Sequence, residues 1–225
     1  MARRATAPAV APAAAPGAGP RPDCALCPRL AAFRGENRTR HPEFHNAPVA
    51  SFGGRDARLL IVGLAPGLKG ANRTGRPFTG DYAGDLLYPT LLRFGFARGI
   101  YGRRPDDGLE LLACRITNAV RCVPPGNKPT TEEIRTCGAF LKAELEALPG
   151  LRAVLALGAV AHGAVLAALG IKKNSFAFAH GAMHDLPGGL LLADSYHCSR
   201  YNTNTGRLSV AMFEAVFVDL RRRLG

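Results

Sequence analysis

Four cysteines have the spacing of ligands for a metal ion or a metal cluster. Cys24 and Cys27 form a C-x2-C pair, and Cys122 and Cys137 follow much later in the chain. Two thiolates at this spacing can reach one metal or cluster, and a four-cysteine set suits either zinc or an iron–sulfur cluster. The alternative is two independent pairs of buried thiols. Disulfides are not expected, because the chain shows no export signal.

A second group of residues suited to chemistry lies in the loop "GLAPGLKGANRTGRPFTGD", residues 63–81. The loop is rich in Gly and Arg, as phosphate-binding loops are, yet it fits no nucleotide-binding fingerprint. Its one aromatic residue is Phe78, which could also simply belong to the core. Its last residue, Asp81, carries a carboxylate that can orient water, although it could instead cap a helix.

Two further loops contribute polar side chains. Asn118 ends a strand-like run, where its amide can accept one hydrogen bond and donate another, or simply cap the strand. The stretch "SYHCSRYNTNTGRL", residues 195–208, contains His197 and several side chains of the kind that contact phosphates. A neutral imidazole N–H at His197 can stabilise negative charge as it develops on a leaving group.

Hydrophobic patterning predicts the elements that position these loops. Short, continuous apolar runs predict strands buried on both faces at residues 59–63, 112–117, 153–157 and 190–194. Helices are predicted at residues 85–94, 130–148, 159–169 and 208–222, the second opened by a capping box. Strands that alternate with helices predict an α/β fold with a parallel sheet covered on both faces. The three polar loops then meet at the carboxyl ends of the strands, where ligands bind.

The composition favours a polyanionic partner. The formal net charge is +12, from 29 Lys and Arg against 17 Asp and Glu, although a generally Arg-rich composition would produce the same excess. Residues 1–21, rich in Ala and Pro, are predicted to be a disordered tail, and residues 22–225 a single domain. No apolar run is long enough to span a bilayer, and no apolar central region of a signal peptide follows the early arginines. We therefore expect a cytoplasmic monomer of bacterial type, used at the nucleoid.

Three ordered motifs and the cysteines together resemble one known family. "GLAPGLKGANRTGRPFTGD", "ITNAVRCVPPGNKPT" and "HCSRYNTNTGRL" resemble the uracil-DNA glycosylase superfamily, in its family-five, or B-type, branch. The resemblance covers roughly residues 22–222. It implies a three-layer α/β/α fold around a four-stranded, mainly parallel sheet, and an enzyme that hydrolyses the N-glycosidic bond of damaged bases in DNA. It also implies a [4Fe-4S] cluster held by the four cysteines.

The resemblance implies a role for each polar loop. The target base is flipped out of DNA, stacked on Phe78 and bonded by Asn118, while Asp81 and His197 are catalytic. The Asn118 amide can accept from uracil N3–H and donate to O4, whereas cytosine presents the reverse pattern. Other residues of the two long loops are expected to contact DNA: Asn72, Arg73, Arg200, Tyr201, Asn204 and Arg207.

The first loop departs from the better-known family-one enzymes at two positions. Those enzymes have a catalytic Asp and a bulky Tyr where this chain has Ala65 and Gly67. We therefore expect a relocated acid, at Asp81, and a roomier base pocket, lined also by Gly63. Such a pocket is expected to accept hypoxanthine and xanthine beside uracil, because they share the edge that Asn118 reads.

The predicted function is a monofunctional uracil-DNA glycosylase of base excision repair, which leaves an abasic site. No obvious Schiff-base lysine for strand cleavage stands in the motifs. Two alternatives stay open. Because Ala65 replaces the usual acid, a protein of this fold could bind or trap damaged DNA without turnover. A structural zinc domain with a generic basic DNA surface is the other alternative.

Overall fold

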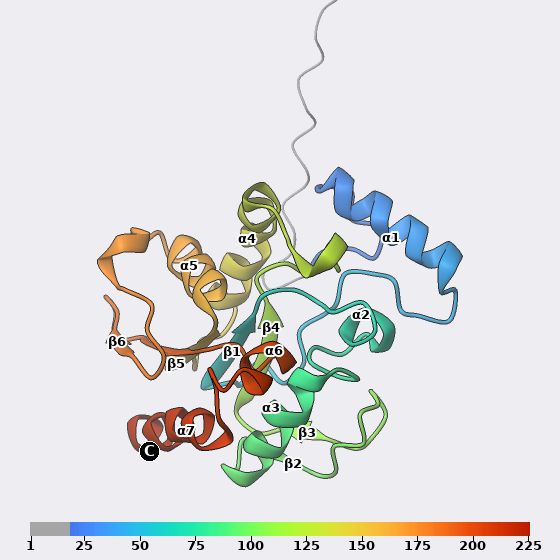
Figure 1. The fold of residues 1–225 in the computed structure, drawn as a ribbon. Helices are drawn as coiled ribbons and strands as arrows, with labels where there is room; N and C mark the ends of the chain where they lie inside the picture. Colours follow the sequence, from blue (N-terminus) through green and yellow to red (C-terminus); the bar gives the residue numbers. More distant parts are fainter. Residues whose placement is uncertain (1–18) are drawn as a thin grey trace, which may run out of the picture.

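A five-stranded sheet forms the centre of the molecule (Figure 1). The computed structural model describes residues 19–225, so residues 1–18 of the predicted tail lie outside the described residues. The strand order is β4-β1-β5-β7-β6. Four of these strands run parallel, and β6 pairs antiparallel with β7 at one edge. The strands are β1 (Leu59–Gly63), β4 (Cys114–Asn118), β5 (Ala153–Leu157), β6 (Met183–Asp185) and β7 (Leu191–Ser195).

The four predicted strands are confirmed as the parallel part of the sheet, with ends shifted by up to two residues. The prediction of four strands in total is wrong by one, because β6 extends the sheet. β6 is a three-residue strand with partly exposed side chains, so it carries no buried apolar run that a sequence pattern could reveal.

Helices cover both faces of the sheet and make three layers (Figure 1). On one face, α3 (Tyr82–Arg93) and α7 (Val210–Leu224) pack with Leu59 and Ile61 of β1. On the other face, α4 (Thr131–Glu146) and α5 (Ala159–Ala168) pack with Leu60 and Val62. Successive side chains of a strand point to opposite faces, so one apolar run serves both cores.

The predicted capping box of α4 is confirmed. The hydroxyl of Thr130 accepts from the backbone N–H of Glu133 at 3.2 Å, and the Glu133 carboxylate accepts from the N–H of Thr130 at 2.8 Å. Two otherwise unpaired donors are thereby satisfied, which fixes the point where the helix begins.

Several elements were not predicted. Helix α1 (Pro28–Arg40) follows Cys27, with Pro28 in the first turn, and lies outside the three layers (Figure 1). The other unpredicted elements are α2 (Ala71–Thr74), α6 (Arg200–Asn204), two short 3-10 helices (Pro125–Asn127 and Lys173–Ser175) and a hairpin of β2 (Ala97–Arg98) and β3 (Glu110–Leu111). None of the helices in residues 19–225 is long and apolar enough to cross a membrane.

Candidate active site

The register of β1 and β4 brings the polar loops to one edge of the sheet. Gly63, the last residue of β1, pairs with Asn118, the last residue of β4. The loops that follow these strands and β7 enclose a small cavity. Its lining comprises Ala65, Pro66, Gly67, Ala71, Phe78, Asp81, Ala83, Asn118 and His197. Six of these residues are predicted site residues.

Gly63 lets Asn118 and Phe78 approach the backbone. A Cβ added at Gly63 would lie 2.4 Å from Oδ1 of Asn118 and 2.5 Å from Cζ of Phe78. Real Cβ atoms do not approach other atoms so closely, and any side chain at this position would displace both residues. The Asn118 amide and the Phe78 ring thus both pack directly against the backbone of Gly63.

Phe78 occupies an unusual backbone conformation. Its φ is +54°, in the left-handed region that residues with bulky side chains rarely enter. Its side chain is 6 % exposed, and its ring stacks on the ring of His197 with 5.9 Å between centroids. Such a conformation persists only where surrounding contacts enforce it, and it is common in binding sites.

Asp81 serves a helix and the cavity at once. It caps the N-terminus of α3, where Oδ1 accepts from the N–H of Gly84 at 3.3 Å. Its Oδ2 faces the glycines of the opening loop, since a Cβ at Gly67 would lie 3.3 Å from it. Burial raises the pKa of Asp81, while backbone N–H groups of Gly84 and Ala83 oppose the shift. The capping role and a chemical role are therefore compatible.

His197 is a neutral imidazole at physiological pH. Burial lowers its pKa to about 4, because a charged ring would lose its hydration. Its backbone carbonyl accepts from Nδ2 of Asn202 at 2.8 Å, which ties the loop back on itself. Cys198, which follows, is completely buried and anchors the loop in the core around α3 and α7.

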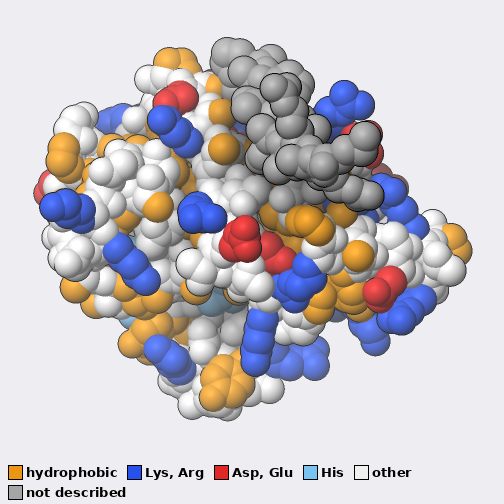
Figure 2. Space-filling view, turned by 90° about the horizontal axis from the view of Figure 1, so that it is seen from above, with side chains coloured by type: hydrophobic (Ala, Val, Ile, Leu, Met, Phe, Trp, Pro, Cys, Tyr) orange, Lys and Arg blue, Asp and Glu red, His pale blue; other side chains and the backbone are white. Residues whose placement is uncertain are grey.

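Five of the six predicted DNA-contacting residues are exposed: Arg73, Arg200, Tyr201, Asn204 and Arg207. The guanidinium of Arg200 lies over the ring of Tyr82 at 5.3 Å, and that of Arg207 lies over Tyr196 at 4.5 Å. Elsewhere on the molecule, Figure 2 shows Lys and Arg side chains spread among fewer acidic ones on the face seen from above.

Asn72 requires a correction, because its side chain is 1 % exposed and cannot contact DNA in this conformation. Its Nδ2 donates to Oδ1 of Asn46 at 2.9 Å, and the Asn46 amide donates to the carbonyl of His41 at 2.7 Å. Asn72 therefore joins α2 to the segment after α1. A polar residue type in a polar loop looks the same in sequence whether it faces solvent or bonds internally.

Sequence reasoning missed Gly70 and the buried residues that fix the loop. A Cβ at Gly70 would lie 2.3 Å from Oδ2 of Asp81. The sequence pointed to Gly70 only through the repeated glycines of "GLKGAN", which do not reveal that Asp81 packs against this position. Arg76 and Asp107, which bond each other across 31 residues, also gave no local signal.

The four predicted metal-binding cysteines line a second cavity, between α1, α4 and the segment after β4. Arg34 is 5 % exposed and points toward it: Nη1 lies 3.5 Å from Sγ of Cys122, and its buried Nε has no protein partner. The N–H of Arg121 donates to Sγ of Cys137 at 3.4 Å. These donors and the positive charge of Arg34 suit a negatively charged thiolate centre.

The structure also shows which possible metal ligands lie close to one another. Among the described residues, the group of possible ligands that comes together within 4.8 Å is His162, His184 and Asp194, and not a trio of cysteines.

The histidine group itself is a hydrogen-bonded network. Nδ1 of His162 lies 2.8 Å from Oδ1 of Asp194, and Nε2 of His184 lies 3.1 Å from Oδ2. His162 donates from Nε2 to the carbonyl of Phe176 at 3.0 Å, because a carbonyl can only accept. Hydrogen bonds within the protein thus occupy these ring nitrogens and both oxygens of Asp194.

Ala65 lies between the two cavities. It lines the cavity that holds Asp81 and His197, and it also packs against the cluster of Leu30, Val120, Cys122 and Cys137. Ala65 therefore connects the cavity of Asp81 and His197 with the apolar residues around the cysteines.

Comparison with known proteins agrees with the site. Residues 50–221 match the uracil DNA glycosylase superfamily. A type-5 uracil-DNA glycosylase of Thermus thermophilus is 47% identical over 207 residues, 90% of this chain and 94% of the relative. A type-5 uracil-DNA glycosylase of Pyrobaculum aerophilum is 43% identical over 192 residues, 84% and 83% of the two chains. A type-4 uracil-DNA glycosylase of Thermotoga maritima is 36% identical over 153 residues, 67% and 69%. The chain therefore belongs to the uracil-DNA glycosylase superfamily, in its type-5 branch.

Proposed function

We propose that this protein is a monofunctional uracil-DNA glycosylase of base excision repair, which hydrolyses the bond between uracil and deoxyribose and leaves an abasic site. The observation that carries the proposal is one cavity lined by Phe78, Asp81, Asn118 and His197. A stacking ring, a carboxylate, an amide and a neutral imidazole are the groups that this reaction uses. The names of the type-5 relatives support the same activity.

Recognition of the base rests on Phe78 and Asn118. The ring of Phe78 stacks on the flipped base, a contact of roughly 1–3 kcal/mol. The amide of Asn118, 3 % exposed, accepts from N3–H and donates to O4 of uracil. Cytosine would leave both amide groups unpaired in a buried site, and the penalty for that discriminates against it.

Bond cleavage rests on Asp81 and His197. The electron pair of the glycosidic bond leaves with N1 of uracil, and the sugar acquires oxocarbenium character. The Asp81 carboxylate stabilises this positive charge, orients the water that adds to C1′ and takes up its proton. The neutral His197 donates an N–H to O2 of the departing uracil anion, worth roughly 2.7–4 kcal/mol in comparable oxyanion sites.

The substrate range is proposed to include hypoxanthine and xanthine. Gly67 leaves open the wall that a bulky side chain would close, and both bases share the edge of uracil that Asn118 reads. The cavity measures about 30 Å³, which is room for a water-sized group and not for a base. Base entry therefore requires the cavity to widen.

The cofactor is proposed to be a [4Fe-4S] cluster held by Cys24, Cys27, Cys122 and Cys137. The four cysteines line one cavity, and the orphaned Nε of Arg34, which lines the same cavity, supports it. When bound, such a cluster supplies a structural crosslink. Its ligands join the start of α1 to α4 and to the loop after β4, whose strand carries Asn118.

DNA is proposed to lie across the loops that follow β1 and β7. Arg73, Arg200 and Arg207 supply phosphate contacts, and Tyr201, 72 % exposed, can enter the space that the flipped base vacates. The net charge of +12 favours this partner over most others.

Release of uracil from a labelled oligonucleotide, under single and multiple turnover, tests the proposal. Asp81→Asn and His197→Ala are each expected to slow release by at least about 100-fold while DNA affinity stays within a few-fold. Asp85→Asn is the matched control, because this carboxylate pairs with Arg103 outside the cavity lining. Tight binding of uracil-DNA without turnover by the wild-type protein would instead support a trapping function. Parallel assays on hypoxanthine and xanthine in single and double strands rank the substrates.

A further inference from the structure

Phe78 is held in its left-handed conformation by hydroxyl groups from distant parts of the chain. The hydroxyl of Tyr101 donates to the carbonyl of Phe78 at 3.3 Å. The hydroxyl of Tyr88 donates to the carbonyl of the preceding Pro77 at 2.5 Å. Both peptide units that flank the α-carbon of Phe78 are therefore held, which fixes the direction in which its side chain leaves the backbone.

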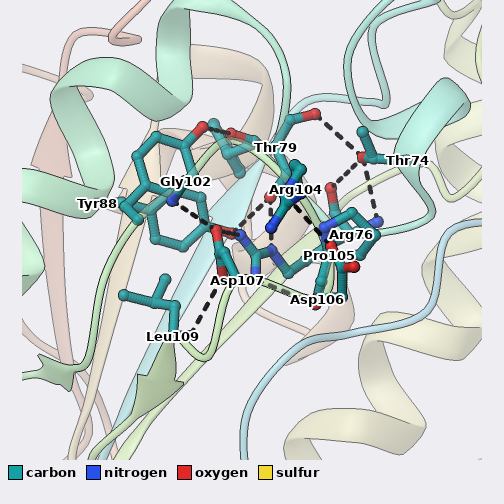
Figure 3. A network of polar contacts seen from close by, with 12 residues as sticks. Thr74, Arg76, Thr79, Tyr88, Gly102, Arg104, Pro105, Asp106, Asp107 and Leu109 are labelled. Atoms are coloured by element: carbon teal, nitrogen blue, oxygen red, sulfur yellow. Dashed lines mark hydrogen bonds and ion pairs between the residues drawn. The ribbon is translucent and has the colours of Figure 1, made fainter.

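A buried ion pair underlies this arrangement (Figure 3). Arg76 donates from Nη1 and Nη2 to the two carboxylate oxygens of Asp107 at 2.8 and 2.7 Å. The backbone N–H groups of Gly102 and Leu109 donate to the same carboxylate. The side chains of Arg76 and Asp107 are only 5 % and 2 % exposed.

The ion pair is connected to Phe78 on both sides. Nε of Arg76 donates to the hydroxyl of Thr79, the residue after Phe78, at 2.7 Å. The guanidinium also lies 5.3 Å from the centroid of Tyr88 and 5.9 Å from that of Tyr101, the two rings whose hydroxyls bond the backbone around Phe78. Neither Arg76 nor Asp107 lines the base cavity.

We propose that the Arg76–Asp107 pair is a positioning device, which holds the Phe78 ring in its stacking place before the base arrives. The inference deepens the proposed function and rests on it. Without the pair, Phe78 can relax toward an ordinary negative φ, and its ring must be reordered each time a base is bound. Arg76 and Asp107 thus affect base binding through Phe78 and touch no reacting atom.

A double-mutant cycle separates this role from general support of the fold. Arg76→Met is expected to lower kcat/KM for uracil release by about 10- to 100-fold, because misplacing a binding group by about 1 Å has an effect of this size. Most of this loss is expected as a higher KM. Phe78→Ala is expected to lower it similarly. The double variant should be no slower than Phe78→Ala alone, because Arg76 acts through the ring. Losses that multiply would overturn the proposal.

Milder variants keep the test valid if Arg76→Met does not fold. Thr79→Val preserves the ion pair and removes its link to the residue after Phe78, so a smaller loss of the same kind is expected. Arg76→Met combined with Asp107→Leu removes both charges and avoids an unpaired buried carboxylate. Arg98→Met is the control. Arg98 pairs with Glu110 on the exposed surface of the β2–β3 hairpin, whose connecting loop carries Asp107. Activity of all these variants equal to wild type would also overturn the proposal.

A readout independent of catalysis distinguishes failure here from failure of the proposed function. Chymotrypsin cleaves after aromatic residues, and Phe78 is buried in the folded protein. Native-state cleavage after Phe78, located by mass spectrometry, is expected to accelerate at least about tenfold in Thr79→Val relative to Arg98→Met. If the wild-type protein releases no uracil but Thr79→Val is still cleaved faster than Arg98→Met, only the glycosylase function is rejected. An active wild type without it would reject the positioning role.

Discussion

Gly70 and Asp81 fit against each other with no room for a side chain between them. A Cβ at Gly70 would lie 2.3 Å from Oδ2, 2.7 Å from Cγ and 2.8 Å from Cβ of Asp81. The side chain of Asp81 thus packs directly against the α-carbon of Gly70. The other oxygen of Asp81 caps α3, so the carboxylate has little freedom to turn away.

Gly70→Ala is expected to reduce uracil release nearly as much as Asp81→Asn, by about 100-fold, because the added methyl must displace the carboxylate. Gly138→Ala is the control, since nothing lies within 4 Å of a Cβ there. Single-turnover rates with saturating enzyme measure the effect. A Gly70→Ala variant at wild-type rate would remove Asp81 from the proposed mechanism.

The pH dependence follows from Asp81 and His197. The proposed mechanism needs an ionised Asp81, whose pKa burial raises, and a neutral His197, whose pKa burial lowers to about 4. His197 becomes protonated as the pH falls toward 4, and acidification also protonates Asp81. Single-turnover rates should be level between about pH 6 and 8 and decline below about pH 5. A rate that rises on acidification would contradict the assigned protonation states.

Asp107 predicts a pH dependence of stability. Its hydrogen bonds to Arg76, Leu109 and Gly102 outweigh burial and lower its pKa to about 2, from an ordinary value of 3.8. A lowered carboxyl pKa stabilises the fold above the unfolded-state value and ceases to do so as the pH falls toward 2. This contribution is about 2 kcal/mol. Asp107→Asn should therefore unfold more easily than wild type at pH 6, and chemical denaturation should show that gap narrowing toward pH 2.

The cysteine cavity predicts a metal content. The wild-type protein should contain iron and acid-labile sulfide in equal amounts, with the broad visible absorbance of a cluster. Cys122→Ser should lose iron and melt at a lower temperature. Cys114→Ala is the matched control, because Cys114 is also buried but belongs to the core cluster of Leu59 and Ile116, away from the cysteine cavity. Zinc without sulfide in the purified protein would reject the proposed cluster.

The parallel strands, the four main helices and the capping box were predictable, because each rests on a local pattern of apolar or capping residues. Helix α1 was not, since its buried face contains Leu30 but also Arg34 and Asn37. Polar residues on a buried face cancel the amphipathic signal, and a cofactor or a backbone partner is what makes their burial possible.

Only those residues of the candidate site that directly follow or end a predicted strand could be placed there from the sequence. Asn118 and His197 follow apolar runs, so their convergence could be expected from the fold. The bond of Asn72 to Asn46 and that of Arg76 to Asp107 join segments 26 and 31 residues apart, and no spacing rule connects such positions. The left-handed φ of Phe78 was equally invisible, because nothing in the residue type favours it.

The place of Ala65 constrains what can be put back at this position. Ala65 lines the cavity of Asp81 and His197, and it also packs against the apolar cluster that contains Leu30, Val120, Cys122 and Cys137. A carboxylate at position 65 would have to displace part of that packing. Ala65→Asp is therefore not a simple return to the arrangement that the resemblance implies for family-one enzymes.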